Sequence, residues 1–458
     1  YAVGTKCQNN NWTLDFSNTF GSNVFNYDVS NTNNASMGAQ SPTEFNAGSH
    51  GFLQNTFNID ASKKINNFNI AFGGEWRFEQ YQIKSGEEAS YKNYGLVSGA
   101  AGGAQSFIGF SNDNALKKSR NSEAIYADVS YDLEKFNVDA AARFENYSDF
   151  GSALTGKLAL RYELFNNFSL RGAVGTGFRA PSLQQQYFNN SYSDISTSGS
   201  GIVNKGIFTN DSAIAQEIGF DKLKEEKSVN ASAGFTFKPV DKLFITLDGY
   251  LIKVKDRIVI TSQFSDASFA AYDVESARFF ANAVDTETKG VDLVVSYDWA
   301  LGGGNLNINL AGNYTETKIT KFNFPEKVLA NHSQDEFFGP DQINIIESLS
   351  PKTKASLGLN YKINKFNFLV RNTYFGEVTR DGFPYGSVQK FAPKVVTDLS
   401  VGYDITKKLN FTIGANNLFD VFPDLQVYEN SYFGVFKYAP VQMGTTGSYF
   451  FGRLNYNF

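Results

Sequence analysis

Apolar and polar residues alternate along much of the chain with a period of two. In the stretch KLALRYEL, Leu158, Leu160 and Tyr162 fall on one face of an extended chain, and Lys157 and Arg161 fall on the other. The stretches NLNINLAGNY and VVTDLSVGYDI repeat this pattern, and so does the C-terminal stretch YFFGRLNYNF. Such alternation predicts β-strands that have one apolar face and one polar face.

These stretches predict an all-β protein of about 17 strands. Many of the stretches extend over ten residues or more, whereas strands of soluble proteins usually have about five or six. The expected strands cover residues 11–19, 22–31, 51–61, 67–83, 121–132, 136–147, 153–163, 167–178, 227–238, 242–260, 286–299, 304–320, 352–363, 365–378, 394–405, 408–419 and 447–458.

The connections between the expected strands alternate between short and long. Tight turns are expected at FGSN (20–23), LGGG (301–304) and TKK (406–408), whereas the long polar stretches include 84–120 and 179–226. This layout is typical of an outer-membrane barrel, whose turns are short on the periplasmic side and long outside. Hydrocarbon cannot satisfy unpaired backbone groups, so a sheet crosses it only when it is closed on itself. We therefore expect a transmembrane antiparallel β-barrel, with a large soluble β-sandwich or propeller as the alternative.

The odd number of expected strands is informative. Bacterial single-chain barrels have an even number of strands, with both termini on the periplasmic side. Counting back from a periplasmic C-terminus places residues 1–10 in an external loop. We therefore expect further N-terminal strands of the barrel outside these residues.

Composition narrows the function classes. The 44 Phe and 24 Tyr residues favour strands, and the balance of 41 basic against 46 acidic residues gives no reason to expect nucleic-acid binding. No run of about 18 apolar residues is present, which excludes a transmembrane helix.

The two histidines, His50 and His332, argue against a multi-histidine metal site or a histidine-based triad, and both are expected near external loops. We expect neither an enzyme nor a resident cofactor.

Cys7 is the single cysteine, which excludes an internal disulfide. Its expected place is an external loop, in an oxidising compartment. Two readings stay open, a disulfide to a cysteine outside these residues and a solitary loop thiol.

Five short segments, taken in order, resemble those of TonB-dependent receptors, the active transporters of the Gram-negative outer membrane. They are SLRGAVGTGFRAPSLQQQYFN (169–189), LKEEKSVNASAGF (223–235), DTETKGVDLVVSY (285–297), IGANNLFD (413–420) and the terminal Phe458. Glu225 stands where the family usually has proline in the second segment. The resemblance extends over most of the chain.

The resemblance implies that residues 1–458 form the C-terminal part of one barrel of about 22 strands, and that the N-terminal plug domain and the first strands lie outside these residues. It also implies that the plug is opened by TonB and its inner-membrane proton-motive complex, through that missing part. The other partners expected are the barrel-assembly machinery and outer-membrane lipid, and a surface lipoprotein stays open. The expected assembly signal is Leu454, Tyr456 and Phe458.

The long loops are where ligand binding is expected. They are rich in Tyr, Phe, Asn and Ser, which suit stacking on sugars or the capture of a siderophore or peptide. The motif FRAP (178–181) is found in many haem receptors, in which loop histidines bind the haem iron, so His332 is a candidate haem ligand. The second motif that accompanies FRAP in those receptors is absent from this sequence. The candidate ligand-binding residues are Arg179, Tyr187, Phe188, Asn189, Asn190, His332, Arg380, Phe383, Tyr385, Tyr428 and Tyr432.

Together these features predict a TonB-dependent active transporter, integral to the cell outer membrane. It would bind a scarce nutrient at the extracellular loops and import it to the periplasm. The nutrient class stays open among ferric siderophores, vitamins, oligosaccharides and peptides. The alternatives are a passive porin-like channel and a barrel subunit of a larger outer-membrane assembly.

Overall fold

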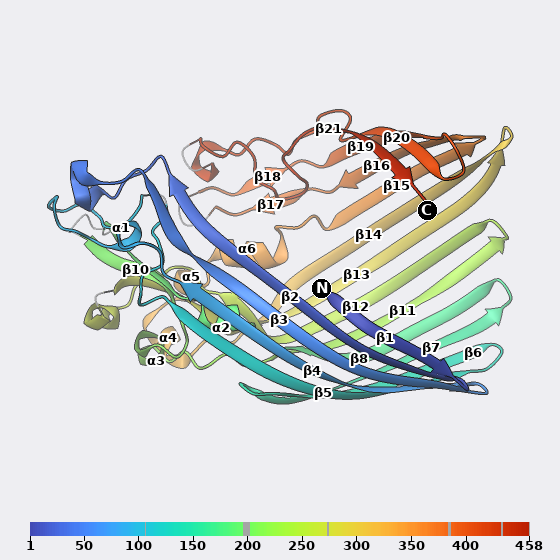
Figure 1. The fold of residues 1–458 in the computed structure, drawn as a ribbon, viewed down its shortest axis with the longest axis horizontal. Coiled ribbons are helices and arrows are strands. Elements are labelled where there is room, and N and C mark those ends of the chain that lie inside the picture. Colours follow the sequence, from blue (N-terminus) through green and yellow to red (C-terminus); the bar gives the residue numbers. More distant parts are fainter. Residues whose placement is uncertain (106, 196–201, 273, 383–385, 432–433, 458) are drawn as a thin grey trace.

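The structure is a computed structural model of residues 1–458, and it describes all of them except 106, 196–201, 273, 383–385, 432–433 and 458. The described chain forms one large twisted sheet of 19 strands that curves into a barrel wall (Figure 1). Two of these strands, β9 (Asn190–Ile195) and β10 (Ile202–Phe208), belong to the loop after β8, and the other 17 form the wall. The predicted all-β antiparallel fold is confirmed.

The wall strands pair in chain order, each antiparallel to its neighbours. They are β1 (Ala2–Asn9), β2 (Trp12–Ser30), β3 (Glu44–Ile65), β4 (Phe68–Lys84), β5 (Leu116–Asp132), β6 (Phe136–Tyr147), β7 (Gly151–Phe165), β8 (Phe168–Arg179), β11 (Glu226–Val240), β12 (Leu243–Ile260), β13 (Val274–Leu301), β14 (Gly304–Phe322), β15 (Thr353–Ile363), β16 (Phe366–Phe375), β19 (Lys394–Asp404), β20 (Leu409–Asn416) and β21 (Tyr449–Tyr456).

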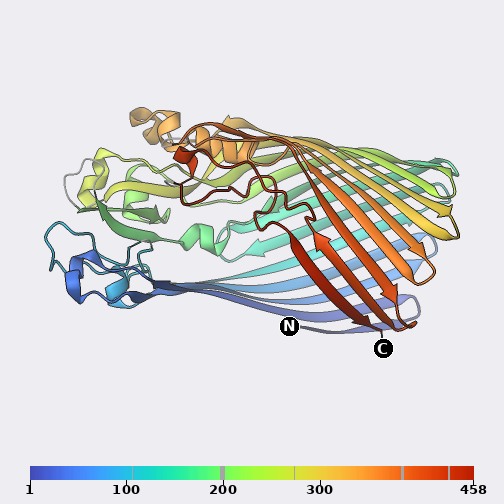
Figure 2. The same ribbon diagram turned by 90° about the horizontal axis from the view of Figure 1, so that it is seen from above.

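Long loops gather at one end of the wall and tight turns at the other, as Figure 2 shows from above. The loops carry short elements: η1 (Ala35–Gln40), α1 (Glu88–Tyr91), α2 (Leu183–Tyr187), α3 (Ala213–Glu217), η2 (Ala267–Tyr272), α4 (Glu326–Asn331), α5 (Gln334–Phe337), α6 (Pro340–Glu347), β17 (Val378–Arg380), β18 (Gln389–Phe391) and η3 (Tyr428–Asn430). None of the helices in the described ranges is both long enough and apolar enough to span a membrane.

The first two strands differ from the prediction. Residues 12–30 form the single strand β2, so the turn expected at 20–23 is wrong, and Gly21 instead pairs with Gln54 of β3. The turn lies at Asn10 and Asn11, whose φ angles of 49° and 65° suit a two-residue hairpin loop. Gly21 suggested a turn because glycine is common in turns, but here it lies in the middle of a strand. Asn10 and Asn11 form the turn because asparagine tolerates the left-handed conformation that this turn requires.

The external-loop placement of residues 1–10 is therefore wrong. Residues 2–9 form β1, which pairs with β2 along its whole length. Cys7 lies opposite Leu14 in this hairpin and is exposed. The number of wall strands still agrees with the prediction, because β1 replaces the strand that was lost when residues 11–31 became one strand.

The two faces of the wall differ as the alternation predicts. On β7, Leu158 and Leu160 are each 43% exposed on the outward face. On the inward face, the Lys157 ammonium lies 2.5 Å from the Asp139 carboxylate of β6. The outward face is thus an apolar band, and the inward face carries ion pairs.

The two edge strands of the wall are β1 and β21. Among the described residues, β1 pairs only with β2, and β21 pairs only with β20. Leu454 and Tyr456 of β21 are exposed on its outward side, opposite Phe411 and Leu409 of β20. Phe458 lies outside the described residues.

We expect a charge in the middle of the apolar band to weaken folding into a bilayer. Leu160→Arg should lower the free energy of unfolding by about 2–4 kcal/mol, because hydrocarbon cannot solvate the guanidinium. Urea titration of the full-length protein folded into phosphatidylcholine vesicles measures this. The matched control is Ala159→Arg on the inward face, which should have little effect. Equal losses in the two variants would contradict the assignment of faces.

Candidate ligand-binding surface at the loop end

The strand end GFR (177–179) is held at the base of the loop that follows β8. The Arg179 guanidinium lies 2.6 Å from the Glu226 carboxylate of β11. Glu226 is buried and also accepts a hydrogen bond from the backbone N–H of Ile258, at 2.8 Å. Arg179 thus ties β8 to β11 and β12 where these strands leave the wall.

Arg120 of β5 is the central anchor of this loop, and the sequence analysis missed it. Its side chain is only 4% exposed and donates to the Glu79 carboxylate at 2.6 Å. It also donates to the carbonyl of Pro181 at 2.8 Å and to Asp149 at 3.3 Å, and it lies over the Tyr147 ring. The motif FRAPS therefore contributes a backbone carbonyl to a buried ion network.

Helix α2 follows this anchor directly. The Ser182 hydroxyl accepts from the N–H of Gln185, and the Gln185 side chain accepts from the N–H of Ser182, which forms a capping box. Leu183 is buried against Tyr81 and Phe110. The helix therefore holds its last residue, Tyr187, and the predicted residues that follow it, 188–190, at a fixed place on the rim.

An aromatic cluster surrounds His50 beside α2. Its Nε2 lies 3.2 Å from the Tyr27 hydroxyl, and its Nδ1 lies 3.3 Å from the Tyr81 hydroxyl. The ring of Phe188 packs edge-on against both His50 and Phe110. We call His50, Tyr27, Tyr81, Phe110 and Phe188 the aromatic rim cluster.

The neighbours of Phe188 are also engaged with protein groups. The Tyr187 ring packs against the aromatic rim cluster and lies under the Lys118 ammonium. The Asn189 Oδ1 accepts from the Asn114 amide at 2.7 Å. Asn190 begins β9, and its side-chain Oδ1 is buried without a hydrogen-bond partner among the described residues. Of this predicted group, Asn190 retains a buried acceptor that a ligand could satisfy.

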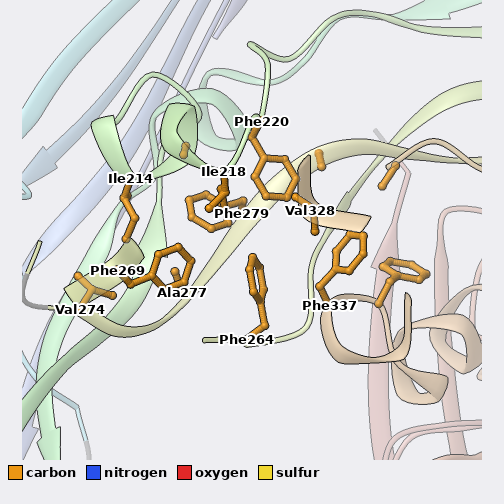
Figure 3. Close-up of a cluster of buried hydrophobic side chains, with 14 of the residues drawn as sticks. Ile214, Ile218, Phe220, Phe264, Phe269, Val274, Ala277, Phe279, Val328 and Phe337 are labelled. Atoms are coloured by element: carbon orange, nitrogen blue, oxygen red, sulfur yellow. The ribbon is translucent and has the colours of Figure 1, made fainter. Parts of the chain in front are cut away.

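A second apolar cluster joins three loops that are far apart in sequence (Figure 3). Phe279 of β13 stacks with Phe220 of the loop before β11, at 4.9 Å between ring centroids. Phe264 packs against both Phe279 and Phe337 of α5. We call this buried group the phenylalanine core, and it makes the long loops a packed layer.

His332 connects two of the loops at the edge of the phenylalanine core. Its Nε2 lies 2.8 Å from the Asp266 carboxylate, and its Nδ1 lies 2.9 Å from that of Glu336. Partial burial disfavours the imidazolium, but the hydrogen bonds to the two carboxylates outweigh this cost, so the pKa of His332 is raised above 6.5. Both ring nitrogens are occupied, so iron ligation would require the ring to leave these partners.

The loop after β16 and the loop after β20 are the last two loops of the chain, and they surround a hollow of about 480 Å³. It is lined by Arg380 and Tyr438 among others, and the Arg380 guanidinium donates to the Gln426 side chain. Asn430 bridges the loops, because its amide donates to the Ser387 carbonyl at 2.8 Å and its Oδ1 accepts from the Ser387 N–H at 3.0 Å.

The Asp424 carboxylate helps to hold these loops together. It lies 2.6 Å from the Lys394 ammonium. The hydrogen bond from Lys394, with a further one from the Ala392 N–H, lowers the pKa of Asp424. Tyr428 begins η3 beside this hollow and is exposed.

A second hollow, of about 500 Å³, lies between residues 210–224 and 323–327. Three lysines, Lys222, Lys224 and Lys327, contribute to its lining, together with acidic groups and Phe220. None of these lining residues was among the candidates predicted from the sequence.

The predicted ligand residues therefore fall into three groups. Arg179 and the residues of and after α2 lie in the loop after β8, His332 lies in the loop after β14, and Arg380 and Tyr428 lie in the last two loops. Phe383, Tyr385 and Tyr432 lie outside the described residues. His50, Arg120 and the phenylalanine core were missed as parts of the surface.

The family profile described as "TonB dependent receptor-like, beta-barrel" matches residues 2–418. This chain belongs to the TonB-dependent receptor family. Members of this family are receptors and transporters of the outer membrane and not enzymes. Among the described residues, no group of three or more His, Cys, Asp or Glu side chains could hold a metal ion.

Several solved structures share the fold. The siderophore receptor PirA from Acinetobacter baumannii has a TM-score of 0.64 at 15% identity, and the match covers 100% of this chain and 62% of PirA. The copper transporter OprC has a TM-score of 0.61 at 16% identity, covering 98% of this chain and 63% of OprC. This chain thus spans about three fifths of the length of these relatives. The vitamin B12 transporter BtuB of Vibrio cholerae is 32% identical over 68 residues, which are 15% of this chain and 11% of BtuB.

We expect the loss of Arg120 to destabilise this receptor strongly. Arg120→Met should cost about 3–5 kcal/mol, because it leaves Glu79 buried without its partner. Chemical denaturation of the full-length receptor measures the loss. Adding Glu79→Gln should restore part of it, and Arg161→Met, at an exposed arginine, should stay within about 0.5 kcal/mol of wild type. A cost for Arg120→Met as small as that of the control would contradict the anchoring role.

We expect the loops around His332 to loosen as pH rises. The pKa of folded His332 lies above 6.5, so its stabilisation is fully present below that value and is lost as pH rises through the folded pKa. Hydrogen bonds from Ser268 and His332 hold the pKa of Asp266 below 3.8, so its contribution is lost only in acid.

Hydrogen exchange of residues 261–272 and 323–352, corrected for the intrinsic pH dependence, tests this. Protection should fall between about pH 5.5 and about pH 8 in wild type. His332→Gln should abolish the difference between the two pH values. An unchanged difference in this variant would show that another group titrates.

Proposed function

We propose that this chain is the barrel part of a TonB-dependent active transporter, which binds a scarce nutrient at the loop end and imports it to the periplasm. One observation carries the proposal: the family match covers 16 of the 17 wall strands, from β1 to β20, and at the loop end the wall carries a folded layer with two hollows. The structural matches at 16% identity or less support the fold alone.

The two faces of the wall support a location in the cell outer membrane. The apolar outward band suits lipid, and the paired charges of the inward face suit a hydrated interior. The barrel-assembly machinery would then recognise the terminal strand through Leu454, Tyr456 and Phe458.

The edge strands support a larger barrel. Unpaired backbone groups at β1 and β21 would be costly in hydrocarbon, so we place further strands of this protein between them, to a total of about 22. A plug domain in the interior would transmit the pull of TonB and its proton-motive partners. Inward ion pairs such as Arg143–Glu145 and Asp139–Lys157 would face this plug or water.

The ligand would bind between the rim and the plug. The half-buried rings of the aromatic rim cluster, the buried Oδ1 of Asn190 and the hollow beside Arg380 offer ring faces, amide groups and one guanidinium. Such surfaces suit a ferric siderophore, a vitamin, an oligosaccharide or a peptide. Binding that differs in affinity between open and closed states would couple capture to release.

We expect uptake to require both this receptor and TonB. A strain that lacks the receptor should lose growth on one of these nutrients at limiting concentration, and plasmid-borne receptor should restore it. Deletion of TonB should abolish the restored uptake, because the closed plug blocks diffusion. Radiolabelled uptake and growth on defined iron, vitamin and carbon sources provide the measurements.

Two controls separate the alternatives. Uptake that continues without TonB, together with ion conductance of the purified receptor in a planar bilayer, would indicate a passive channel. Arg380→Ala should weaken binding of the identified nutrient by about tenfold, whereas Lys238→Ala at the opposite end of the wall should not change it.

A further inference from the structure

A group of lysines lies on the outward face of β12, β13 and β14, directly beyond the apolar band. The outward positions of β13 from its turn end are apolar as far as Val291, and the next two are Lys289 and Glu287. The same change occurs on β14, where Tyr314 is followed by Glu316 and Lys318. The apolar outward positions of β13 are Leu301, Trp299, Tyr297, Val295, Leu293 and Val291.

The outward residues change from apolar to charged at the height expected for the edge of the hydrocarbon layer of a membrane. Ten residues separate Leu301 from Val291. A rise of about 3.3 Å per residue and a tilt of about 45° give a band of roughly 23 Å, close to the apolar belt of about 25 Å in outer-membrane barrels. The lysines therefore project outward at the level of lipid headgroups.

The strand register places these charges in adjacent rows. Lys253 of β12 lies opposite Glu287, and Glu287 lies opposite Lys318. Lys289 lies opposite Glu316 in the next row. The whole group therefore depends on the pairing of three strands and occupies one patch of the outward face.

Each carboxylate in the patch is shared by two lysines. Glu287 lies 2.6 Å from the Lys289 ammonium and 3.2 Å from that of Lys253. Glu316 lies 2.6 Å from Lys352, which directly precedes β15, and 3.9 Å from Lys318. Four ammonium groups thus face two carboxylates, which leaves a net charge of +2.

The lysines are the more exposed partners. The side chains of Lys253, Lys289 and Lys318 are 57–66% exposed, and Lys352 is 45% exposed, whereas Glu287 and Glu316 are 21% and 29% exposed. Each ammonium has three donors, and the carboxylates beneath occupy only some of them. The glutamates hold the lysines side by side and leave donors directed outward.

The outward face of β5 to β7 has no such group of lysines at this height. On β5 to β7, the corresponding positions beyond the apolar residues are Glu123, Asn146 and Ser152. On β11, the outward Lys227 lies opposite Lys255 and 3.1 Å from the Glu225 carboxylate, so it borders the patch as a paired charge. Lys255 of β12 adds a further exposed ammonium beside the patch.

We propose that Lys253, Lys289, Lys318 and Lys352 bind the phosphate groups of a phosphorylated glycolipid in the outer leaflet. Phosphate oxygens accept charge-assisted hydrogen bonds from ammonium groups. The acyl chains of the same molecule would lie along the apolar band formed by Val291 and Tyr314. The inference rests on the membrane location proposed above but not on the transported nutrient.

The experiment titrates the full-length receptor in detergent micelles with bisphosphorylated lipid A, and follows binding by native mass spectrometry. A variant with Lys253, Lys289, Lys318 and Lys352 replaced by glutamine should bind at least about tenfold more weakly. Removing the phosphates from the lipid should weaken binding to wild type by a similar factor. The matched control replaces Lys238, Lys362, Lys407 and Lys408 by glutamine, at the turn end, and should bind like wild type.

Three outcomes would overturn the proposal. One is equal affinity of wild type and the patch variant, and another is an equal loss in the control variant. A third is saturable binding of inorganic phosphate alone with the affinity of the lipid, which would assign the patch to a free anion. Nutrient uptake by the same variants is a separate measurement, so a failure of lipid binding leaves the transport proposal standing, and the reverse also holds.

Discussion

The antiparallel hydrogen-bond ladder is the constraint on which the rest of this receptor depends. Each wall strand must pair along both edges to satisfy its backbone groups, and successive side chains must then point to opposite faces. Once the register of β12, β13 and β14 is set, Val291 and Tyr314 face outward, as do Glu287 and Lys318. The apolar band, the inward ion pairs and the outward lysines all follow from this one alternation.

The loops use a different kind of interaction. They cannot continue the ladder, so they are held by buried side chains that join segments far apart in sequence. Arg120 binds both the wall and the carbonyl of Pro181, and the phenylalanine core packs three loops together. These contacts turn polar connections into a layer with hollows of defined shape, as a selective binding surface requires.

The hydrogen-bond ladder shapes the wall, and side-chain packing shapes the loop layer. The wall is regular and places chemically different surfaces on its two faces, whereas the loop layer is irregular and carries the ring faces, amides and ion pairs of the rim. His332 lies where two loops meet, with Asp266 on one and Glu336 on the other. Changes in this layer can therefore alter the proposed ligand binding while the wall keeps its structure.

The sequence by itself determined the all-β class, the faces of most wall strands and the family, because a period of two and short motifs are local properties. The predicted number of wall strands agreed with the structure only because two errors cancelled, since β1 was missed and β2 was counted as two strands. It did not locate the first hairpin, since Gly21 resembles a turn locally and only pairing with β3 makes it part of a strand. The partners of Arg120 and His332 could not be predicted from the sequence either. Glu79 and Asp266 lie 41 and 66 residues away from them, and only the tertiary register and the packing of the loops bring such groups together.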